Sequence, residues 1–178
     1  MTSVQSCAEV WLPPDLWSAL IGVAQMSYPL EACALLSGFW QGRKLIMTGV
    51  HPCRNISPEP ECAFEIDPAD HCALLRQMRQ SGDSIVACAH SHPNQRPLPS
   101  QRDKVAAVGS DLVWLIITAK SVTAWVPPPT PADPAVISAP RFRPLLLRRE
   151  ALKDQQRTVM HHETALDQSL KNSQPSQR

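Results

Sequence analysis

Residues 84–93 constrain the fold of this 178-residue chain more than any other segment. Residues 84–89 form a compact apolar run, which predicts a buried strand, and the run leads into His90-Ser-His92-Pro93. Because proline has no backbone N–H to offer a neighbouring strand, the strand is expected to end here. Side chains two residues apart on a strand leave it on the same face. The two histidines are therefore predicted to form a chelating pair at the end of a core strand.

A short helix is expected to bring a third ligand to this pair. Ser100 is a typical N-cap for a helix over residues 101–108, and Asp103 lies one turn into that helix. From there its carboxylate can swing back towards the strand end. Two neutral imidazoles and one carboxylate form a catalytic zinc set that leaves a fourth position for water. We expect one Zn²⁺ per chain, with a bound water, held by His90, His92 and Asp103.

Hydrolysis of a peptide bond also needs a group that moves a proton. Glu31 opens an apolar run over residues 31–38 that predicts a second buried strand, which would bring the carboxylate beside the histidine strand. A carboxylate there can take the proton of the water and pass it to the leaving amine. Ser100 can donate a hydrogen bond to the developing oxyanion. Glu31 and Ser100 are therefore the candidate catalytic residues.

The rest of the chain predicts an α/β fold, because helical and strand patterns alternate along it. Residues 51–61 are expected to form a loop and residues 64–67 a short extended piece. The other helices are expected over residues 12–27 and 68–82, and further strands over residues 44–50, 112–118, 121–126 and 142–147.

We expect one domain, residues 1–147, followed by a polar tail over residues 148–178. A proline-rich loop over residues 127–140 interrupts the domain. In the tail, apolar residues recur every seven positions, which gives a thin stripe of Leu152, Val159 and Leu166. A loosely docked helix, a homodimer contact and disorder all remain open for this stripe.

Charge and composition exclude several classes of function. A net charge of +1 gives no basic excess of the kind typical of nucleic-acid binding. No apolar run approaches the ~20 residues of a membrane span, and the N-terminus has no signal-peptide pattern, so we expect a cytoplasmic protein. Without a signal peptide or a Cys-x-x-Cys pair, the six cysteines are expected to be reduced. Cys88 shares the strand face of the histidines, and a buried, inert thiol is favoured over a ligand.

Together, Glu31, the His90-Ser-His92-Pro93 motif, Ser100 and Asp103 resemble the signature of the JAMM, or MPN-plus, zinc isopeptidases. Asn55 and residues 64–68 also look like landmarks of that family, and the resemblance covers most of residues 10–126. One departure is Ala34, which stands where relatives commonly have glycine.

The resemblance implies a cytidine-deaminase-like mixed α/β fold, in which helices flank a curved sheet. It also implies hydrolysis after the C-terminal glycine of a ubiquitin-like protein, joined through a peptide or isopeptide bond. Small bacterial relatives of this shape act on sulfur-carrier proteins of the ThiS/MoaD type and release an amino acid such as cysteine. The C-terminus of such a carrier is the expected partner, with neither nucleic acid nor membrane involved.

Two other functions fit the same fold. A RadC-like protein, a branch linked to DNA repair, shares the His, Pro, Ser and Asp spacing, but its motif has Asn where this chain has Ser91 and Ser-Gly where it has Asn94-Gln95. A non-catalytic scaffold of the MPN-minus kind binds partners through the same fold, and such domains typically lack ligands that this chain retains. The residues favour the peptidase.

Overall fold

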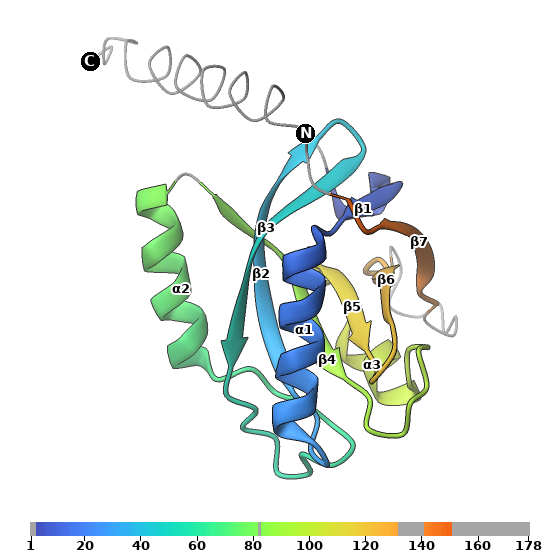
Figure 1. Ribbon diagram of the computed structural model, residues 1–178. Helices are drawn as coiled ribbons and strands as arrows, with labels where there is room; N and C mark the ends of the chain where they lie inside the picture. Colours follow the sequence, from blue (N-terminus) through green and yellow to red (C-terminus); the bar gives the residue numbers. More distant parts are fainter. Residues whose placement is uncertain (1–2, 82, 132–140, 151–178) are drawn as a thin grey trace, which may run out of the picture.

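The computed structural model describes residues 3–81, 83–131 and 141–150 (Figure 1). Within these ranges the chain forms a 3₁₀ turn at Val4–Ser6, three α-helices and seven strands. The helices are α1 (Pro14–Ser27), α2 (Pro68–Ser81) and α3 (Gln101–Ala106). The strands are β1 (Glu9–Trp11), β2 (Cys33–Gln41), β3 (Lys44–Cys53), β4 (Ser84–Ser91), β5 (Val113–Ile117), β6 (Val122–Val126) and β7 (Arg143–Arg148).

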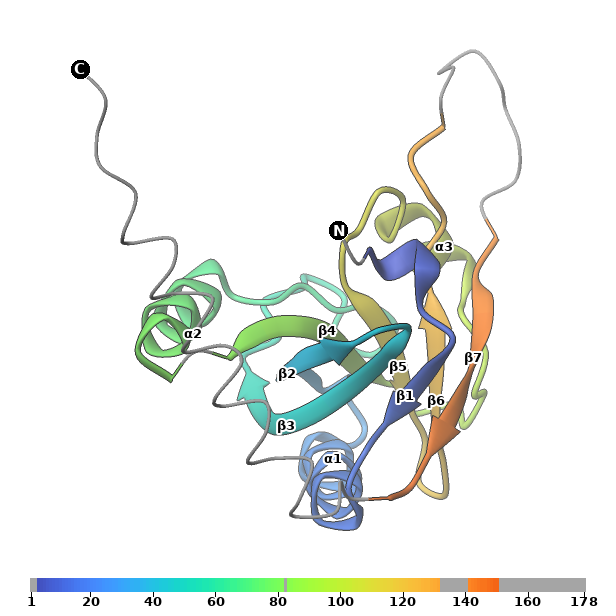
Figure 2. The same cartoon turned by 90° about the horizontal axis from the view of Figure 1, so that it is seen from above.

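All seven described strands belong to one mixed sheet that closes on itself in the order β1-β3-β2-β4-β5-β6-β7. Strand β4 lies between β2, to which it is antiparallel, and β5, to which it is parallel. Strand β1 runs parallel to both β3 and β7 and closes the ring (Figure 2). The expected α/β fold, a curved mixed sheet flanked by helices, is confirmed, whereas its closure by β1 was not predicted.

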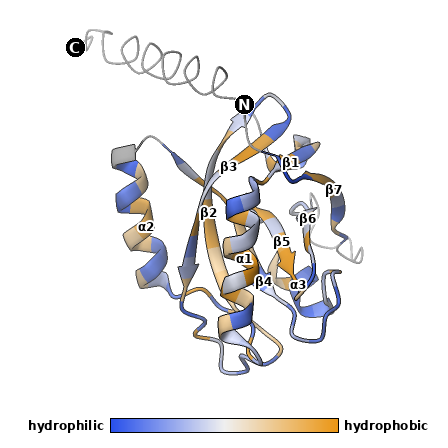
Figure 3. Cartoon of the chain, in the orientation of Figure 1, coloured by the Kyte–Doolittle hydropathy of each residue, from blue (hydrophilic) through white to orange (hydrophobic). Residues whose placement is uncertain are grey.

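Each face of the sheet has its own apolar core, because successive side chains of a strand point to opposite faces. On the face covered by α1, Leu20 packs with Leu36 of β2 and Ala89 of β4. On the other face, Leu35 of β2 and Cys88 of β4 pack against α2. The buried residues around them are Leu74, Met78, Ala107 and Trp114. In Figure 3, β5 is hydrophobic along its length, as expected for a strand covered on both faces.

The expected helices and strands are present, and two differences have physical reasons. Strand β1 is only three residues long, which is too short to show an alternating pattern. Strand β3 continues through His51, Pro52 and Cys53, where a loop was expected. Proline is tolerated there because β1 pairs only with residues Lys44 to Ile46, so the far end of β3 has β2 as its single neighbour.

The segment expected to be extended, residues 64–67, forms a single bridge, between Ile66 and Asn55. Most of the proline-rich loop and the tail stripe of Leu152, Val159 and Leu166 lie outside the described residues. A homodimer through that stripe therefore stays a prediction. In the part of the chain that the structure describes, no helix has the length and apolar character needed to cross a membrane.

The contact between α1 and the sheet predicts a large effect of one substitution. Leu20 is fully buried in the core beneath α1, so Leu20→Ala is expected to lower the free energy of unfolding by ~2–5 kcal/mol. Leu75→Ala on α2 is the matched control, because that side chain is 44% exposed, and its cost should stay below ~1 kcal/mol. Urea denaturation measures both values, and equal costs would contradict the described core.

Candidate metal centre

The three predicted ligands meet at the end of β4. The Nε2 atoms of His90 and His92 lie 2.9 Å apart, and each is 3.3 Å from one carboxylate oxygen of Asp103. All three side chains are buried. Among the described residues they form the one group of three His, Cys, Asp or Glu side chains arranged to hold a metal ion. Strand alternation thus brings together the residues that the sequence singled out.

Neighbouring groups fix the orientation of both imidazoles. The ring of Phe64 stacks on His90, with 4.3 Å between ring centroids, and Trp114 meets the same ring edge-on. The Nδ1 atom of His92 lies 2.7 Å from the carbonyl oxygen of Arg96. A carbonyl can only accept, so Nδ1 of His92 carries a proton, and Nε2 presents a lone pair to the site whenever the ring is neutral. An outer hydrogen bond of this kind is usual for a metal-binding histidine.

Asp103 is aimed at the histidines by the start of α3. Ser100 is the N-cap, as predicted: its Oγ accepts a hydrogen bond from the backbone N–H of Asp103, and its own N–H donates to the carboxylate at 2.6 Å. Burial by itself would raise the pKa of Asp103, but its contacts with His90, His92 and the backbone N–H of Ser100 hold that pKa well below its usual range. Asp103 is therefore an ionised carboxylate in a buried site.

Glu31 lies just before β2, where backbone contacts hold it on two sides. Its N–H donates to the carbonyl of Pro60 at 2.6 Å, and the side-chain amide of Asn55 donates to its carbonyl oxygen at 2.9 Å. The next residue, Ala32, exchanges hydrogen bonds with Ser91 of β4 through the backbone N–H and the hydroxyl of that serine. The start of β2 is thereby fixed against the end of β4.

The electrostatic surroundings of Glu31 favour a proton-transfer role. Burial is the main cause that raises the pKa of Glu31 to about 7. The charge of His92 lowers this pKa, and the charge of Asp103 raises it, both by less than burial does. Cys33, two residues after Glu31, pairs with His90 of β4, so Glu31 lies near the strand end that carries the three-ligand group. A carboxyl that titrates near neutral pH can both accept and release a proton there.

The donor set fits zinc in chemistry and in protonation. Burial lowers the pKa of His90, so its imidazole is neutral. When the His92 ring is neutral, its Nε2 has the lone pair, and His90 Nε2 is the donor of the contact between the two rings. His90 Nδ1 is buried and has no hydrogen-bond partner among the described residues. Moving the His90 proton to Nδ1 would free both Nε2 lone pairs for a cation, beside one carboxylate.

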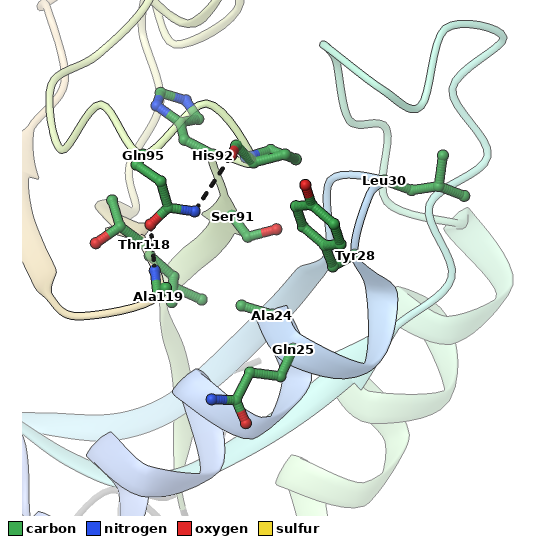
Figure 4. Close-up of a pocket in the computed structure, with 11 residues that line it drawn as sticks. Ala24, Gln25, Tyr28, Leu30, Ser91, His92, Gln95, Thr118 and Ala119 are labelled. Carbon is green, nitrogen blue, oxygen red and sulfur yellow. Dashed lines mark hydrogen bonds between the residues drawn. The ribbon is translucent and has the colours of Figure 1, made fainter.

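A cavity of about 290 Å³ adjoins this group (Figure 4). It lies between the C-terminal end of α1 and the turn that joins β5 to β6, and His92 forms part of its wall. The surface of its wall is mostly apolar. The lining residues are Ala24, Gln25, Tyr28, Leu30, Ser91, His92, Pro93, Gln95, Ile117, Thr118 and Ala119.

The family described as prokaryotic homologs of the JAB domain matches residues 13–127, which is more than half of the chain. The chain belongs to this family. The matched range begins just before α1 and ends just after β6, so this JAB domain includes all the candidate site residues.

Several proteins are similar to this JAB domain. The desampylase of Haloferax volcanii is 36% identical over 88 residues, which are 49% of this chain and 62% of the relative. Tail tip assembly protein K of Escherichia phage N15 is 31% identical over 56% of this chain and 37% of its own. A probable TtuB-protein conjugate cleaving protease of Thermus thermophilus is 38% identical over 37% of this chain and 44% of its own. The chain thus spans less than two thirds of each relative.

A solved structure shows the same fold as this JAB domain. The solution structure of a Desulfitobacterium hafniense protein superposes with a TM-score of 0.63 and 25% sequence identity. The superposition covers 81% of this chain and 95% of the other. The fold is therefore shared over almost the whole length of that protein.

Some groups around the site of this JAB domain were not found from the sequence. The carbonyl of Arg96 carries no side-chain signal, and the hydroxyl of Ser91 points away from the histidines, on the opposite face of β4. Phe64 and Asn55 were noted only as family landmarks, without the contacts that they make. The alternation of β4 was the one available signal for Ser91, because neighbouring side chains of a strand face opposite sides.

The six cysteines of this chain are all free thiols, and the group of His90, His92 and Asp103 contains none of them. Burial raises the pKa of Cys7 to about 11 and the pKa of Cys33 to about 12, and raises that of Cys88 as well. Cys62 and Cys72 are exposed. Cys88 is buried, as expected, and the reduced state of the six cysteines stays a prediction.

This difference in exposure predicts the reactivity of the thiols. In the native protein at pH 8, Cys62 and Cys72 should react rapidly with an aromatic disulfide reagent, because both are accessible and the thiolate is the reactive form. Cys7, Cys33 and Cys88 should react only after unfolding in guanidinium chloride. Absorbance of the released thiolate counts the reactive groups, and mass spectrometry assigns them. Rapid native labelling of Cys88 would contradict its described burial.

Proposed function

We propose that this protein is a zinc-dependent peptidase that cleaves the peptide or isopeptide bond after the C-terminal glycine of a ubiquitin-like protein or a ThiS/MoaD-like sulfur carrier. Membership of the JAB family supports the hydrolytic chemistry. The names of the desampylase and of the TtuB-protein conjugate cleaving protease support a substrate of the ubiquitin-like class.

One observation carries the proposal: His90, His92 and Asp103 converge in a buried site next to a carboxyl group whose pKa is raised to about 7. A purely structural cluster would not need Glu31 buried beside a second carboxylate, because each buried charge costs free energy. A hydrolytic site does need one group that holds the metal and another that moves protons. The four side chains divide into those two roles.

The residues act as follows in the proposed reaction. Zinc, held by His90, His92 and Asp103, supplies Lewis-acid polarisation of the scissile carbonyl and makes water nucleophilic at neutral pH. Glu31 accepts the proton of the attacking water and transfers it to the leaving amine. Ser100 uses its hydroxyl proton, which is not needed for the cap of α3, to donate a hydrogen bond to the developing oxyanion.

The cavity beside His92 is proposed to bind substrate residues next to the scissile bond. Its wall is continuous with the metal-binding group through His92, and Leu30, also in its wall, directly precedes Glu31. A mostly apolar, concave site with a few polar groups is typical of specific ligand binding. The substrate chain would then cross the site between α1 and the β5–β6 turn.

Metal binding and turnover can be separated by two substitutions. The wild-type protein should hold about one zinc per chain, which a strong chelator removes. His90→Ala should lose both the zinc and the cleavage of a carrier-Gly-Gly-X fusion. Glu31→Gln should retain the zinc and lower kcat by ~10²-fold or more, because it removes the proton acceptor. Metal analysis by mass spectrometry and gel-based cleavage measure these outcomes.

Other outcomes of this experiment would favour the alternatives. Stoichiometric binding of the carrier fusion without cleavage by the zinc-loaded protein would favour a scaffold. Salt-sensitive binding of DNA would favour the RadC-like reading. Full activity of Glu31→Gln would contradict the proposed proton transfer.

Filling the cavity should weaken substrate binding without affecting the metal. Ala24 lies on α1 and lines the cavity, so Ala24→Phe is expected to raise KM for the fusion about tenfold, or ~1.4 kcal/mol, with zinc content unchanged. Ala19→Phe is the matched control, because Ala19 is an exposed residue of the same helix outside the cavity. Steady-state kinetics with the carrier fusion measures KM for both variants. Equal KM values would show that the cavity takes no part in binding.

A further inference from the structure

The loop that follows His92 is fastened to the β5–β6 hairpin at two points. The backbone N–H of Ala119, in the hairpin turn, donates to Oε1 of Gln95 at 2.8 Å. The hydroxyl of Thr123, on β6, donates to the carbonyl oxygen of Pro97 at 2.8 Å. Arg96 lies between these two fastened residues, and its carbonyl oxygen is the acceptor for His92 Nδ1. Both attachments therefore act on the group that fixes the His92 ring.

Gln95 is held in an unfavourable backbone conformation. Its φ is 62°, and it is the one non-glycine residue with positive φ in the described ranges. This left-handed conformation is unfavourable for a residue with a side chain and persists only where surrounding contacts impose it.

The contacts around Gln95 are hydrogen bonds and not packing. The backbone N–H of Gln95 donates to the carbonyl of His92 at 3.0 Å, and its side-chain amide donates to the carbonyl of Pro93 at 3.2 Å. Figure 4 shows the two side-chain bonds, which reach in opposite directions, one to Pro93 and one to Ala119. Because Gln95 is exposed, it contributes little to the apolar core.

We infer that Gln95 and Thr123 are positioning residues that hold the Arg96 carbonyl against Nδ1 of His92. They fix the tautomer of His92 whose Nε2 lone pair faces His90 and Asp103. A loop released from the hairpin would let this carbonyl move away, and the neutral ring would then exchange between its two tautomers. The effect on metal affinity rests on the proposed function, whereas the effect on the tautomer does not.

The tautomer can be read directly in metal-free protein. Long-range ¹⁵N–¹H correlations of histidine-labelled protein distinguish Nδ1–H from Nε2–H rings. At an alkaline pH, where the His92 ring is neutral, the wild-type spectrum should show His92 as a single Nδ1–H tautomer. Gln95→Leu and Thr123→Val should each give averaged imidazole ¹⁵N shifts for His92, and the double variant a larger change. A wild-type Nδ1–H pattern in a folded double variant would overturn the inference.

Conservative variants and a distant control separate positioning from general damage. Gln95→Glu keeps an acceptor for Ala119, and Thr123→Ser keeps the hydroxyl, so both should retain the wild-type tautomer. Gln77→Leu changes an exposed residue of α2 and should have no effect. If Gln95→Leu does not fold, Gln95→Gly replaces it, because glycine adopts positive φ readily and removes only the side-chain bonds.

Zinc affinity provides the second readout. Competition with a chromophoric chelator should show that the double variant binds Zn²⁺ about 10–100-fold more weakly than wild type, the usual effect of losing an outer partner of a ligand histidine. Thr123→Ser and Gln95→Glu should stay close to wild type. Failure of the wild-type protein to bind zinc would contradict the proposed function, while the ¹⁵N spectra would still decide the positioning role. An unchanged affinity in the double variant would contradict that role.

Discussion

The structure depends on the pairing of β4 with a strand on each side. Backbone hydrogen bonds to antiparallel β2 and parallel β5 place β4 inside the sheet and fix which way each of its side chains points. The register aligns His90 with Cys33 of β2, so Glu31, two residues earlier, lies close to the histidines. A slip of one residue would turn His90 and His92 to the α1 face, away from Asp103.

The buried polar groups at this point are stabilised by one another. Four ionisable side chains, Glu31, His90, His92 and Asp103, are each at most 6% exposed. Burial of a charge costs free energy unless it is paired, and the paired arrangement of Asp103 with the two imidazoles and the Ser100 N–H meets that requirement. Among the described residues Glu31 has no such set of partners, and burial raises its pKa. This contrast gives two carboxylates of one site different protonation behaviour, which suits ligand and proton carrier respectively.

Two loops add contacts to the site at the end of β4. The segment between β3 and α2 contributes Asn55 and Pro60 to the backbone of Glu31 and Phe64 to the ring of His90. The segment between β4 and α3 contributes the Arg96 carbonyl and is attached to the β5–β6 hairpin. Functional groups carried on loops over a rigid sheet are common, because loops can vary while the scaffold stays fixed. The JAB family match, which ends just after β6, includes both segments.

The sequence by itself determined the α/β alternation, the histidine pair on one strand face, the Ser100 cap and the ligand group, because these depend on local periodicity and on spacing within one short segment. It could not determine the closing strand β1, since three residues show no period, nor the continuation of β3 past Pro52, which depends on a missing neighbour. The tertiary structure alone decided which contacts Phe64, Ser91, Gln95 and Arg96 make around the site. Some of these contacts join segments far apart in the chain, and others are made by backbone carbonyl groups. Neither kind of contact leaves a pattern in the order of the side chains.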